Sequence, residues 1–477
     1  MSQDSNQAEP ILLAGKPVIR DEADPLRNPY DGTEIARISQ ATADDATVAC
    51  REAATAFAET RSLPSWLRAQ ILTRIAERIA AQAEALARGI ALEAGKPIRD
   101  ARVEVGRSVQ TFQVAAEEAK RLDGEILPLD WTPGTENRAG LIRRFPIGPV
   151  LGITPFNFPI NLVSHKVAPA IASGNPIIIK PAPQTPMTAL ALGKIVVEAG
   201  WPAGGISVLP CSNDVTAVML HDEHIRMLSF TGSAAVGWEL RAAVPKKRVV
   251  LELGGNAACI VHADADVELA AKRIVAGGFV YSGQSCISVQ RVFVHEDVRE
   301  LLLSRIVSGV NRLVVGDPLE ETTQIGPMVN QAAAVRAESW IREAVETGAT
   351  LLTGGQRREN ILEPAVLADV KPDSQLAREE AFAPVIFVNS YTDFFNVLTA
   401  VNNSRYGLQA AVFTSSWDRM TEAWNTLEVG AVLINETSAW RAEHMPYGGV
   451  KDSGIGREGL RSAIEEMTDP RMLVVKL

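Results

Sequence analysis

Residues 148–182 read GPVLGITPFNFPINLVSHKVAPAIASGNPIIIKPA, and this stretch decides the fold class. Two short apolar runs, 148–156 and 175–182, are rich in β-branched residues and flanked by Gly, Pro and Asn, so each predicts a buried strand. The residues between them, 161–174, have helical spacing. A strand, a helix and a second strand in this order predict a βαβ unit and a parallel, doubly wound sheet.

The same alternation continues towards the C-terminus. A helix is expected over 186–199, strands over 205–210 and 226–232, and a helical segment between these strands. After Val249 the pattern restarts, with strands over 258–266 and 289–296 and helices over 267–284 and 298–313. We therefore expect a second α/β domain that begins near Leu253.

The N-terminal part adds a different pattern. Residues 11–18 predict a short hairpin, and helices are expected over 44–60, 64–93 (one long amphipathic helix) and 98–120. Turn residues between apolar segments over 124–148 predict a projecting β-hairpin. The final residues, 470–477, predict a strand with no local partner, which pairs either with a distant segment or with another subunit.

Composition excludes several classes of function. The chain has 477 residues, 46% of them apolar, so it can bury large cores in two or more domains. Its net charge of −10 disfavours binding to nucleic acid or to an anionic membrane. Residues 1–10 lack the features of a secretory signal, and no apolar run reaches the ~20 residues of a membrane span, so a cytoplasmic location is expected.

The histidines and cysteines indicate free thiols and no metal. Six scattered histidines form no HExxH motif, so no zinc site is predicted. Four cysteines form no CxxC pair. Cys50, Cys211 and Cys259 lie among apolar residues and are interpreted as buried structural thiols. Cys286, in YSGQSCISVQR, follows Gly283 and small polar residues, where backbone N–H groups could stabilise a reactive thiolate; a buried inert cysteine is an equally good interpretation.

Several further residues near predicted strand ends suggest chemistry. Glu252, in VVLELGGNAACIV, lies between apolar residues before Gly254, and burial there would raise its pKa towards that of a general base. A strand-edge glutamate that faces water is the commoner outcome. Asn157, in TPFNFP, could donate to an oxyanion, and Lys180 ends a predicted strand of the same sheet, where doubly wound folds bind ligands. Taken singly, Asn157 is explained better by a Pro-rich turn and Lys180 by a solvent-facing side chain. Gly232 and Ser233 precede a predicted helix whose N-terminus could hold a pyrophosphate, although for this motif alone a plain strand-to-helix turn is the commoner explanation.

Taken in order, these segments resemble the aldehyde dehydrogenase superfamily. The resemblance runs through LEAGKP, TPFNFP, KPAPQTP, FTGSAAVG, LELGG, GQSC, EEAFAPV and MPYGGVKDSGIGREG, and so covers nearly the whole chain. It implies a nicotinamide cofactor, NAD or NADP, and an aldehyde substrate. The closest likeness is to the branch of lactaldehyde-type and phosphonoacetaldehyde-type dehydrogenases.

The resemblance implies a role for each matching residue. Cys286 matches the nucleophile, Glu252 the general base, and Asn157 the oxyanion-hole donor. The residues that match the cofactor site are Thr154, Pro155, Phe156, Lys180 (at the adenosine ribose), Gly232, Ser233 (at the pyrophosphate), Leu253, Gly254, Glu380 (at the nicotinamide ribose) and Phe382.

The implied fold is a Rossmann-like cofactor domain, an α/β catalytic domain and a small β oligomerisation element. The expected boundaries are 1–120 and 142–252 for the cofactor domain, 253–455 for the catalytic domain, and 121–141 with 456–477 for the oligomerisation element. A homodimer or homotetramer is expected, in which the C-terminal strand extends the catalytic-domain sheet of the partner.

Three positions depart from the family pattern. Pro183 stands where many NAD-preferring members have a glutamate that binds the 2′-hydroxyl, so NAD and NADP both stay open. Phe156 replaces a common Trp and Ala383 a common Gly, and both changes should be tolerated. For the substrate, Arg107 and Arg441 are candidates to bind an anionic or hydroxylated tail, although both could be surface residues. A small polar aldehyde is favoured over a phosphonate or phosphate, which would need a tighter cationic cluster.

Three other functions compete with this hypothesis. A semialdehyde dehydrogenase that acylates coenzyme A would typically lack the glutamate base, whereas Glu252 is present. A non-catalytic relative would not need Cys286, Glu252, Asn157 and Lys180 together. A redox-sensing cysteine protein would leave the cofactor motifs unexplained.

Overall fold

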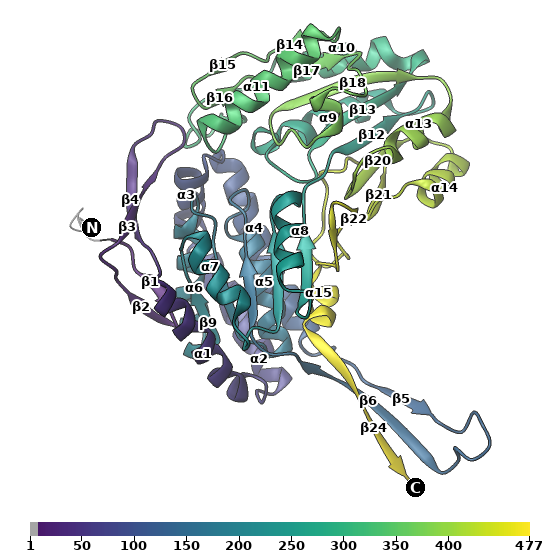
Figure 1. The fold of residues 1–477 in the computed structure, drawn as a ribbon. Coiled ribbons are helices and arrows are strands. Elements are labelled where there is room, and N and C mark those ends of the chain that lie inside the picture. Colours follow the sequence, from purple (N-terminus) through teal and green to yellow (C-terminus); the bar gives the residue numbers. More distant parts are fainter. Residues whose placement is uncertain (1–7) are drawn as a thin grey trace.

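The computed structural model describes residues 8–477, and most of residues 1–10, considered above for a secretory signal, lie outside that range. Two α/β bodies lie side by side, and a small sheet projects from one of them (Figure 1). This confirms the predicted α/β class with parallel-stranded sheets. Within residues 8–477, no helix is long and apolar enough to cross a membrane.

The first body is built on an eight-stranded sheet. Its inner strands are parallel, as the βαβ pattern predicted, and an antiparallel strand or hairpin closes each side. In spatial order the strands are β2 (Lys16–Val18), β1 (Ile11–Leu13), β9 (Ile206–Val208), β8 (Ile177–Lys180), β7 (Val150–Ile153), β10 (Met227–Thr231), β11 (Arg248–Glu252) and β23 (Gly454–Ile455).

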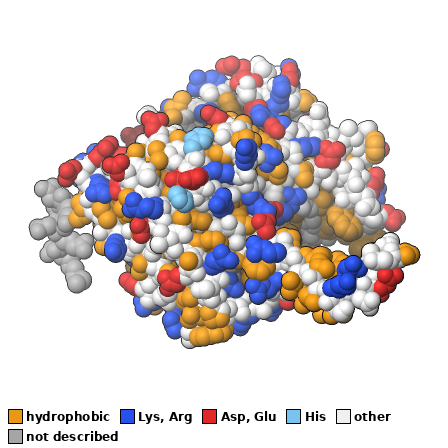
Figure 2. Space-filling model, turned by 60° about the horizontal axis from the view of Figure 1, so that its bottom comes forward, with side chains coloured by type: hydrophobic (Ala, Val, Ile, Leu, Met, Phe, Trp, Pro, Cys, Tyr) orange, Lys and Arg blue, Asp and Glu red, His pale blue; other side chains and the backbone are white. Residues whose placement is uncertain are grey.

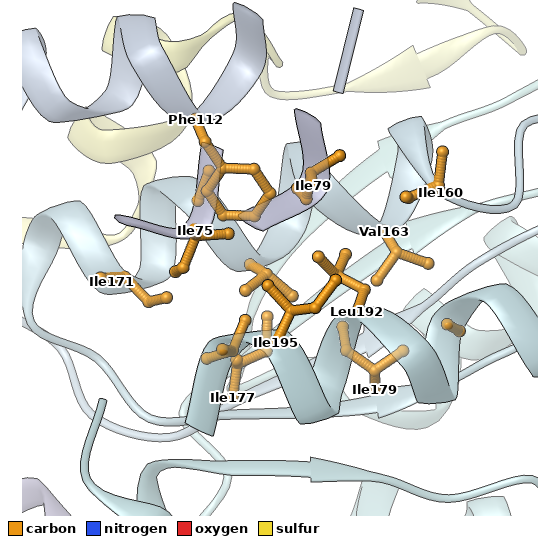
Figure 3. Close-up of a cluster of buried hydrophobic side chains, with 14 of the residues drawn as sticks. Ile75, Ile79, Phe112, Ile160, Val163, Ile171, Ile177, Ile179, Leu192 and Ile195 are labelled. Atoms are coloured by element: carbon orange, nitrogen blue, oxygen red, sulfur yellow. The ribbon is translucent and has the colours of Figure 1, made fainter. Parts of the chain in front are cut away.

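Helices cover both faces of this sheet. Along β8, Ile177 and Ile179 pack into the core on one face and Ile178 into the core on the other, because successive side chains of a strand point in opposite directions. The core on the face of Ile177 and Ile179 is the larger of the two. Figure 3 shows Phe112 and isoleucines from several helices packing around Ile177 and Ile179. The helices on that face are α2 (Ser65–Ala81), α3 (Ala83–Ala94), α4 (Ile98–Glu118), α5 (Asn161–Ser173), α6 (Pro186–Glu198) and α15 (Leu460–Glu466); those on the other are α1 (Ala43–Thr60), α7 (Asn213–His221) and α8 (Ala234–Ala243).

One predicted helix is wrong in its continuity. The single helix expected over 64–93 is two helices, α2 and α3, separated at Gln82, whose backbone leaves the helical region (φ −112°, ψ 15°). Both helices bury apolar faces, so the periodicity runs through the break. Glutamine is a good helix former, and nothing in its type signals an interruption.

The second body has a seven-stranded sheet that is parallel except at one edge. Its order is β14 (Thr350–Thr353), β17 (Ala365–Ala368), β18 (Val385–Tyr391), β13 (Val289–His295), β12 (Ala257–Val261), β20 (Gln409–Phe413) and β21 (Ala431–Ile434). The helices around it are α9 (Val267–Phe279), α10 (Arg299–Val310), α11 (Gln331–Glu346), α12 (Gln375–Arg378), α13 (Phe394–Asn402) and α14 (Trp417–Thr426). Short ribbons complete the chain: β3 (Ala23–Arg27) with β4 (Glu34–Ser39), β15 (Arg357–Arg358) with β16 (Ile361–Leu362), and β19 (Tyr406–Gly407) with β22 (Val450–Lys451).

The projecting sheet contains the predicted hairpin, β5 (Glu125–Pro128) and β6 (Arg138–Pro146), and the C-terminal strand β24 (Thr468–Lys476). β24 pairs along β6 of the same chain, so its partner is distant in sequence, which was one of the two outcomes expected. The sheet and its β5–β6 loop carry exposed apolar side chains, among them Trp131 in the loop and Leu473 and Val474 in β24. In Figure 2 the lobe at the lower right shows apolar side chains mixed with charged ones. The boundary expected between residues 141 and 142 falls inside β6.

Candidate active site

Five segments converge at the carboxyl ends of β7, β8, β10 and β11. Thr154 follows β7, Lys180 ends β8, Gly232 follows β10 and Glu252 ends β11. Because these strands are parallel neighbours, their ends meet at one edge of the sheet, where doubly wound folds bind ligands. The fifth segment, which contains Cys286, comes from the second body.

A strained turn presents Cys286 to this edge. After α9 the backbone is left-handed at three consecutive residues, Tyr281 (φ 48°), Ser282 (φ 54°) and Gly283 (φ 68°). A Cβ on Gly283 would lie 2.1 Å from the carbonyl oxygen of Ala383, so this position requires glycine on two grounds. Such strain persists only where the surroundings hold it, and it is typical of functional sites.

Two cavities meet at Cys286 and Glu252, which line both of them. The larger has a volume of 360 Å³ and lies towards the first sheet and α8. The smaller, of 180 Å³, lies towards α4 and the segment before β22. A reactive sulfur at the junction of two cavities can contact a ligand in each of them at the same time.

The larger cavity gathers most of the residues expected to bind a cofactor. The rings of Phe156 and Phe382 meet edge to face across it, with their centres 5.9 Å apart. Its lining includes Pro155, Phe156, Gly232, Ser233, Leu253, Gly254, Glu380 and Phe382. Two expected residues, Thr154 and Lys180, lie outside that lining; the N–H of Thr154 donates to the carbonyl of Lys180 at 3.1 Å.

Two features of this cavity suit a ribose and a phosphate. Oε1 of Glu380 accepts from the N–H of Gly255 at 3.1 Å, and burial raises the pKa of this carboxyl to about 7. Ser233 precedes α8, and its side chain caps no N–H of that helix within residues 8–477. The first-turn N–H groups of α8 thus face this end of the cavity with their dipole.

Asn157 lies beside the sulfur, held from two sides. Its side-chain Nδ2 donates to the carbonyl of Gln284 at 3.0 Å. The main-chain carbonyl of Asn157 accepts from Nζ of Lys96 at 2.7 Å. An amide nitrogen carries two hydrogens, so a second remains for a ligand. Asn157 lines the larger cavity, which places its amide where it could donate to an oxygen on a carbon bound to Cys286.

Glu252 is buried, with 3% of its surface exposed, and neither carboxylate oxygen has a hydrogen-bond partner among the described residues. Burial raises its pKa well above the ordinary value, and the neighbouring Glu458 raises it further. Arg441 and Lys166 oppose this rise. An unpartnered buried carboxyl is costly, and a raised pKa lets such a group exchange a proton at a higher pH than an ordinary glutamate.

The thiol of Cys286 departs from the expectation of a stabilised thiolate. Burial raises its pKa to about 12, with Glu380 and Glu252 adding to the rise. Nearby backbone N–H groups can be expected from the local sequence, whereas desolvation comes from residues far from Cys286 in sequence, which include parts of the first body. Two groups act in the other direction: the hydroxyl of Tyr447, 3.1 Å from Sγ, and the charge of Arg441.

Arg107 and Arg441 line the smaller cavity; the side chain of Arg107 is 25% exposed, and that of Arg441 is almost fully buried. Nε of Arg107 donates to Glu443 at 2.6 Å, and a second oxygen of Glu443 is bonded to His165. Arg441 is 5% exposed in its side chain, and its Nη2 donates to Glu458 at 3.3 Å. Each guanidinium has further N–H groups that do not bond these glutamates; among them, Nε of Arg441 is buried from solvent and has no partner within residues 8–477.

Several residues of the site carried no signal of their own in the sequence. They are Lys96, Glu104, His165, Lys166, Gln284, Glu443, Tyr447 and Glu458. Half of them, Lys96, Gln284, Tyr447 and Glu458, lie in segments that support the family resemblance, but a buried lysine or glutamate looks like a surface one until its partner is known. Across residues 8–477 no cluster of three His, Cys, Asp or Glu side chains could hold a metal ion.

The comparisons with known proteins agree on one family. The model described as the aldehyde dehydrogenase family matches residues 20–473. A 3-sulfolactaldehyde dehydrogenase of Priestia aryabhattai is 42% identical over 94% of this chain and 94% of its own. The solved structure of aldehyde dehydrogenase 21 from Physcomitrella patens, in complex with the reaction product succinate, has a TM-score of 0.96 and 41% identity over 98% of each chain. A glyceraldehyde-3-phosphate dehydrogenase from Methanocaldococcus jannaschii, complexed with NADP, has a TM-score of 0.92 and 36% identity over 96% of this chain and 100% of its own.

Proposed function

The chain belongs to the aldehyde dehydrogenase family, and from this premise we propose that it oxidises a small polar aldehyde of the lactaldehyde type to its carboxylic acid, with NAD or NADP. The observation that carries the proposal is the junction of two cavities at Cys286 and Glu252. One cavity gathers the residues that match the cofactor site. The other gathers two arginines suited to a polar tail.

In the proposed reaction Cys286 forms the covalent bond. Its thiolate attacks the aldehyde carbon and forms a C–S bond, and the carbonyl oxygen becomes an oxyanion. The free amide hydrogen of Asn157 and the N–H of Cys286 donate to that oxygen. Loss of hydride from the carbon leaves a thioester on the sulfur.

Glu252 then serves the second half of the reaction. The carboxylate takes a proton from water, the resulting hydroxide attacks the thioester carbon, and the C–S bond breaks to release the acid and the Cys286 thiolate. A base must be deprotonated to act. Since burial raises the pKa of Glu252, hydrolysis should become faster as the pH rises through that value.

The residues of the larger cavity fit a nicotinamide nucleotide. When bound, NAD or NADP would accept the hydride. Phe156 and Phe382 can hold a planar ring beside Cys286, Glu380 can accept from ribose hydroxyls, and the start of α8 can hold a phosphate. Pro183 offers no side chain that would select between NAD and NADP.

The smaller cavity favours a substrate tail with at most one negative charge. Arg107 and Arg441 each already pair with a glutamate, Glu443 and Glu458 respectively, so the cluster is largely neutralised. The remaining N–H groups suit a hydroxyl, a carboxylate or a sulfonate better than a dianionic phosphate. The similarity to a 3-sulfolactaldehyde dehydrogenase supports the same class of substrate.

The proposed assembly is a homodimer or homotetramer. The three-stranded sheet projects from the body and exposes Trp131, Leu473 and Val474, and β24 lies at its edge. An exposed strand with apolar side chains is a ready template for another chain. The sequence predicts residues 121–141 and 456–477 for this oligomerisation element, 1–120 and 142–252 for cofactor binding, and 253–455 for catalysis; we propose to extend the oligomerisation element to the end of β6 at Pro146 and to leave α15 with the cofactor-binding body.

A panel of aldehydes tests the function. Reduction of NAD and of NADP would be followed by absorbance with lactaldehyde, 3-sulfolactaldehyde, succinic semialdehyde, phosphonoacetaldehyde and propanal. We expect a hydroxylated or singly charged aldehyde to have the highest kcat/KM. Turnover only in the presence of coenzyme A would overturn the hydrolytic role of Glu252 and favour the acylating alternative.

A further inference from the structure

The strongest contact not yet assigned a role joins Tyr447 to the reacting sulfur. The hydroxyl of Tyr447 lies 3.1 Å from Sγ of Cys286, although 161 residues separate the two in sequence. Tyr447 is 4% exposed, and it also lines the smaller cavity. A phenol at this distance shares a hydrogen with the sulfur.

The phenol is held in place on several sides. The N–H of Tyr447 donates to the carbonyl of Glu458 at 3.0 Å, and the N–H of Glu458 donates back at 2.7 Å. The guanidinium of Arg441 lies 3.8 Å from the ring centre, and Ile287 and Leu408 pack in the same cluster. The hydroxyl therefore needs no rearrangement to reach the sulfur, which is the condition for preorganised stabilisation of charge.

The direction of the hydrogen bond depends on the state of the sulfur. While Cys286 is a thiol, either group can donate. Once the sulfur is a thiolate it can only accept, so the phenol must be the donor. Within this buried junction the carboxyls of Glu252 and Glu380 work against the thiolate, and the hydroxyl and Arg441 are the groups that work for it.

We propose that Tyr447 is a further catalytic residue, whose hydroxyl donates to the Cys286 thiolate and keeps Sγ at the junction of the two cavities. The inference rests on the proposed function, in which that thiolate is the nucleophile. When the thioester breaks, the same hydroxyl donates a hydrogen bond to the thiolate that is released. No proton leaves Tyr447 in this role, since it donates a hydrogen bond and not the proton itself.

Alkylation of the thiol tests this donor without any aldehyde. The rate of reaction of Cys286 with iodoacetamide, located by mass spectrometry, would be measured between about pH 7 and 10 for the wild type and for Tyr447→Phe. A hydrogen bond to a charged group is worth enough that its loss should slow alkylation about tenfold at fixed pH. The ring and its contact with Arg441 are kept in this variant. Equal rates at every pH would overturn the proposal.

A matched control and a second readout separate the possible causes. Tyr391→Phe removes a hydroxyl that bonds His262 at 2.8 Å in the second body, and it should leave alkylation of Cys286 unchanged. The aldehyde turnover of Tyr447→Phe should fall with the alkylation rate, and because the whole pH range lies below the raised pKa of the thiol, the alkylation ratio of wild type to variant should stay nearly constant while both rates rise with pH. If the aldehyde panel fails but the alkylation difference appears, the proposed function is wrong while the contact between Tyr447 and the thiolate stands.

Discussion

The ammonium of Lys96 donates a hydrogen bond of 2.7 Å to the main-chain carbonyl of Asn157, 61 residues further along the chain. The same ammonium is paired with Glu104, whose other oxygen accepts from the N–H groups of Ile160 and Asn161 at the start of α5. One buried ion pair thus fixes both the amide beside Cys286 and the helix that follows it.

Lys96→Met should therefore destabilise the protein. The change leaves the Glu104 carboxylate buried without its cation, a loss of about 3–5 kcal/mol in comparable cases. Urea denaturation would show it as a lower midpoint. Lys194→Met is the control, because the ion pair of Lys194 with Glu9 is exposed and long (3.8 Å), so it should cost less than about 1 kcal/mol. Equal effects of the two substitutions would contradict the structural role of Lys96.

Cys286→Ser should abolish aldehyde-dependent reduction of the nicotinamide. A hydroxyl at this position lacks the nucleophilicity of a thiolate, so turnover should fall at least about a thousandfold. Cys50→Ala, which changes a thiol on the buried face of α1, should keep near-wild-type turnover. Wild-type rates in the serine variant would refute the thioester route.

Glu252→Gln should separate the two halves of the reaction. Without a base, one equivalent of reduced nicotinamide should still form rapidly, while steady-state turnover falls by about 10²–10⁴. In the wild type the steady-state rate should rise with pH, because the raised pKa keeps Glu252 protonated at lower pH. The Gln variant should lack this rise. Glu346→Gln, on the exposed end of α11, is the control and should behave like the wild type.

Arg107→Met tests how the smaller cavity selects its substrate. KM should rise about tenfold or more for an aldehyde with an anionic tail, and it should change little for propanal, which has no group for the guanidinium to bind. Arg102 lies on the same helix but faces solvent, where it pairs with Glu84 and Glu321. Arg102→Met should leave both KM values unchanged; an equal rise for both aldehydes in Arg107→Met would point to a general loss of structure.

Gly283→Ala should damage the turn that presents Cys286. The new Cβ would approach the Ala383 carbonyl oxygen to 2.1 Å at a φ of +68°, and the strain should lower both the melting temperature and kcat. Gly89→Ala is the opposite case, since Gly89 lies in α3 with nothing within 4 Å of the added methyl. It should stabilise the protein by about 0.5–1 kcal/mol. An unchanged kcat in Gly283→Ala would contradict the importance of this turn.

The sequence by itself determined the fold class and the order of the elements. Apolar runs such as 175–182 can only be buried strands in this context, and local periodicity and turn residues report on neighbours along the chain. The family motifs also identified Cys286, Glu252 and Asn157 as the candidates. The break between α2 and α3 at Gln82 could not be predicted from the sequence, because the apolar face of the helix continues across it.

Only the tertiary structure decided the pKa shifts of the active-site residues and the partners with which they pair. Desolvation of Cys286 comes from two bodies closing over it, and the contact with Tyr447 spans 161 residues. The pairing of Arg107 with Glu443 joins α4 to a segment 336 residues away. Burial, ion pairing and hydrogen bonding at the site depend on distances through space, and a sequence pattern records only distances along the chain.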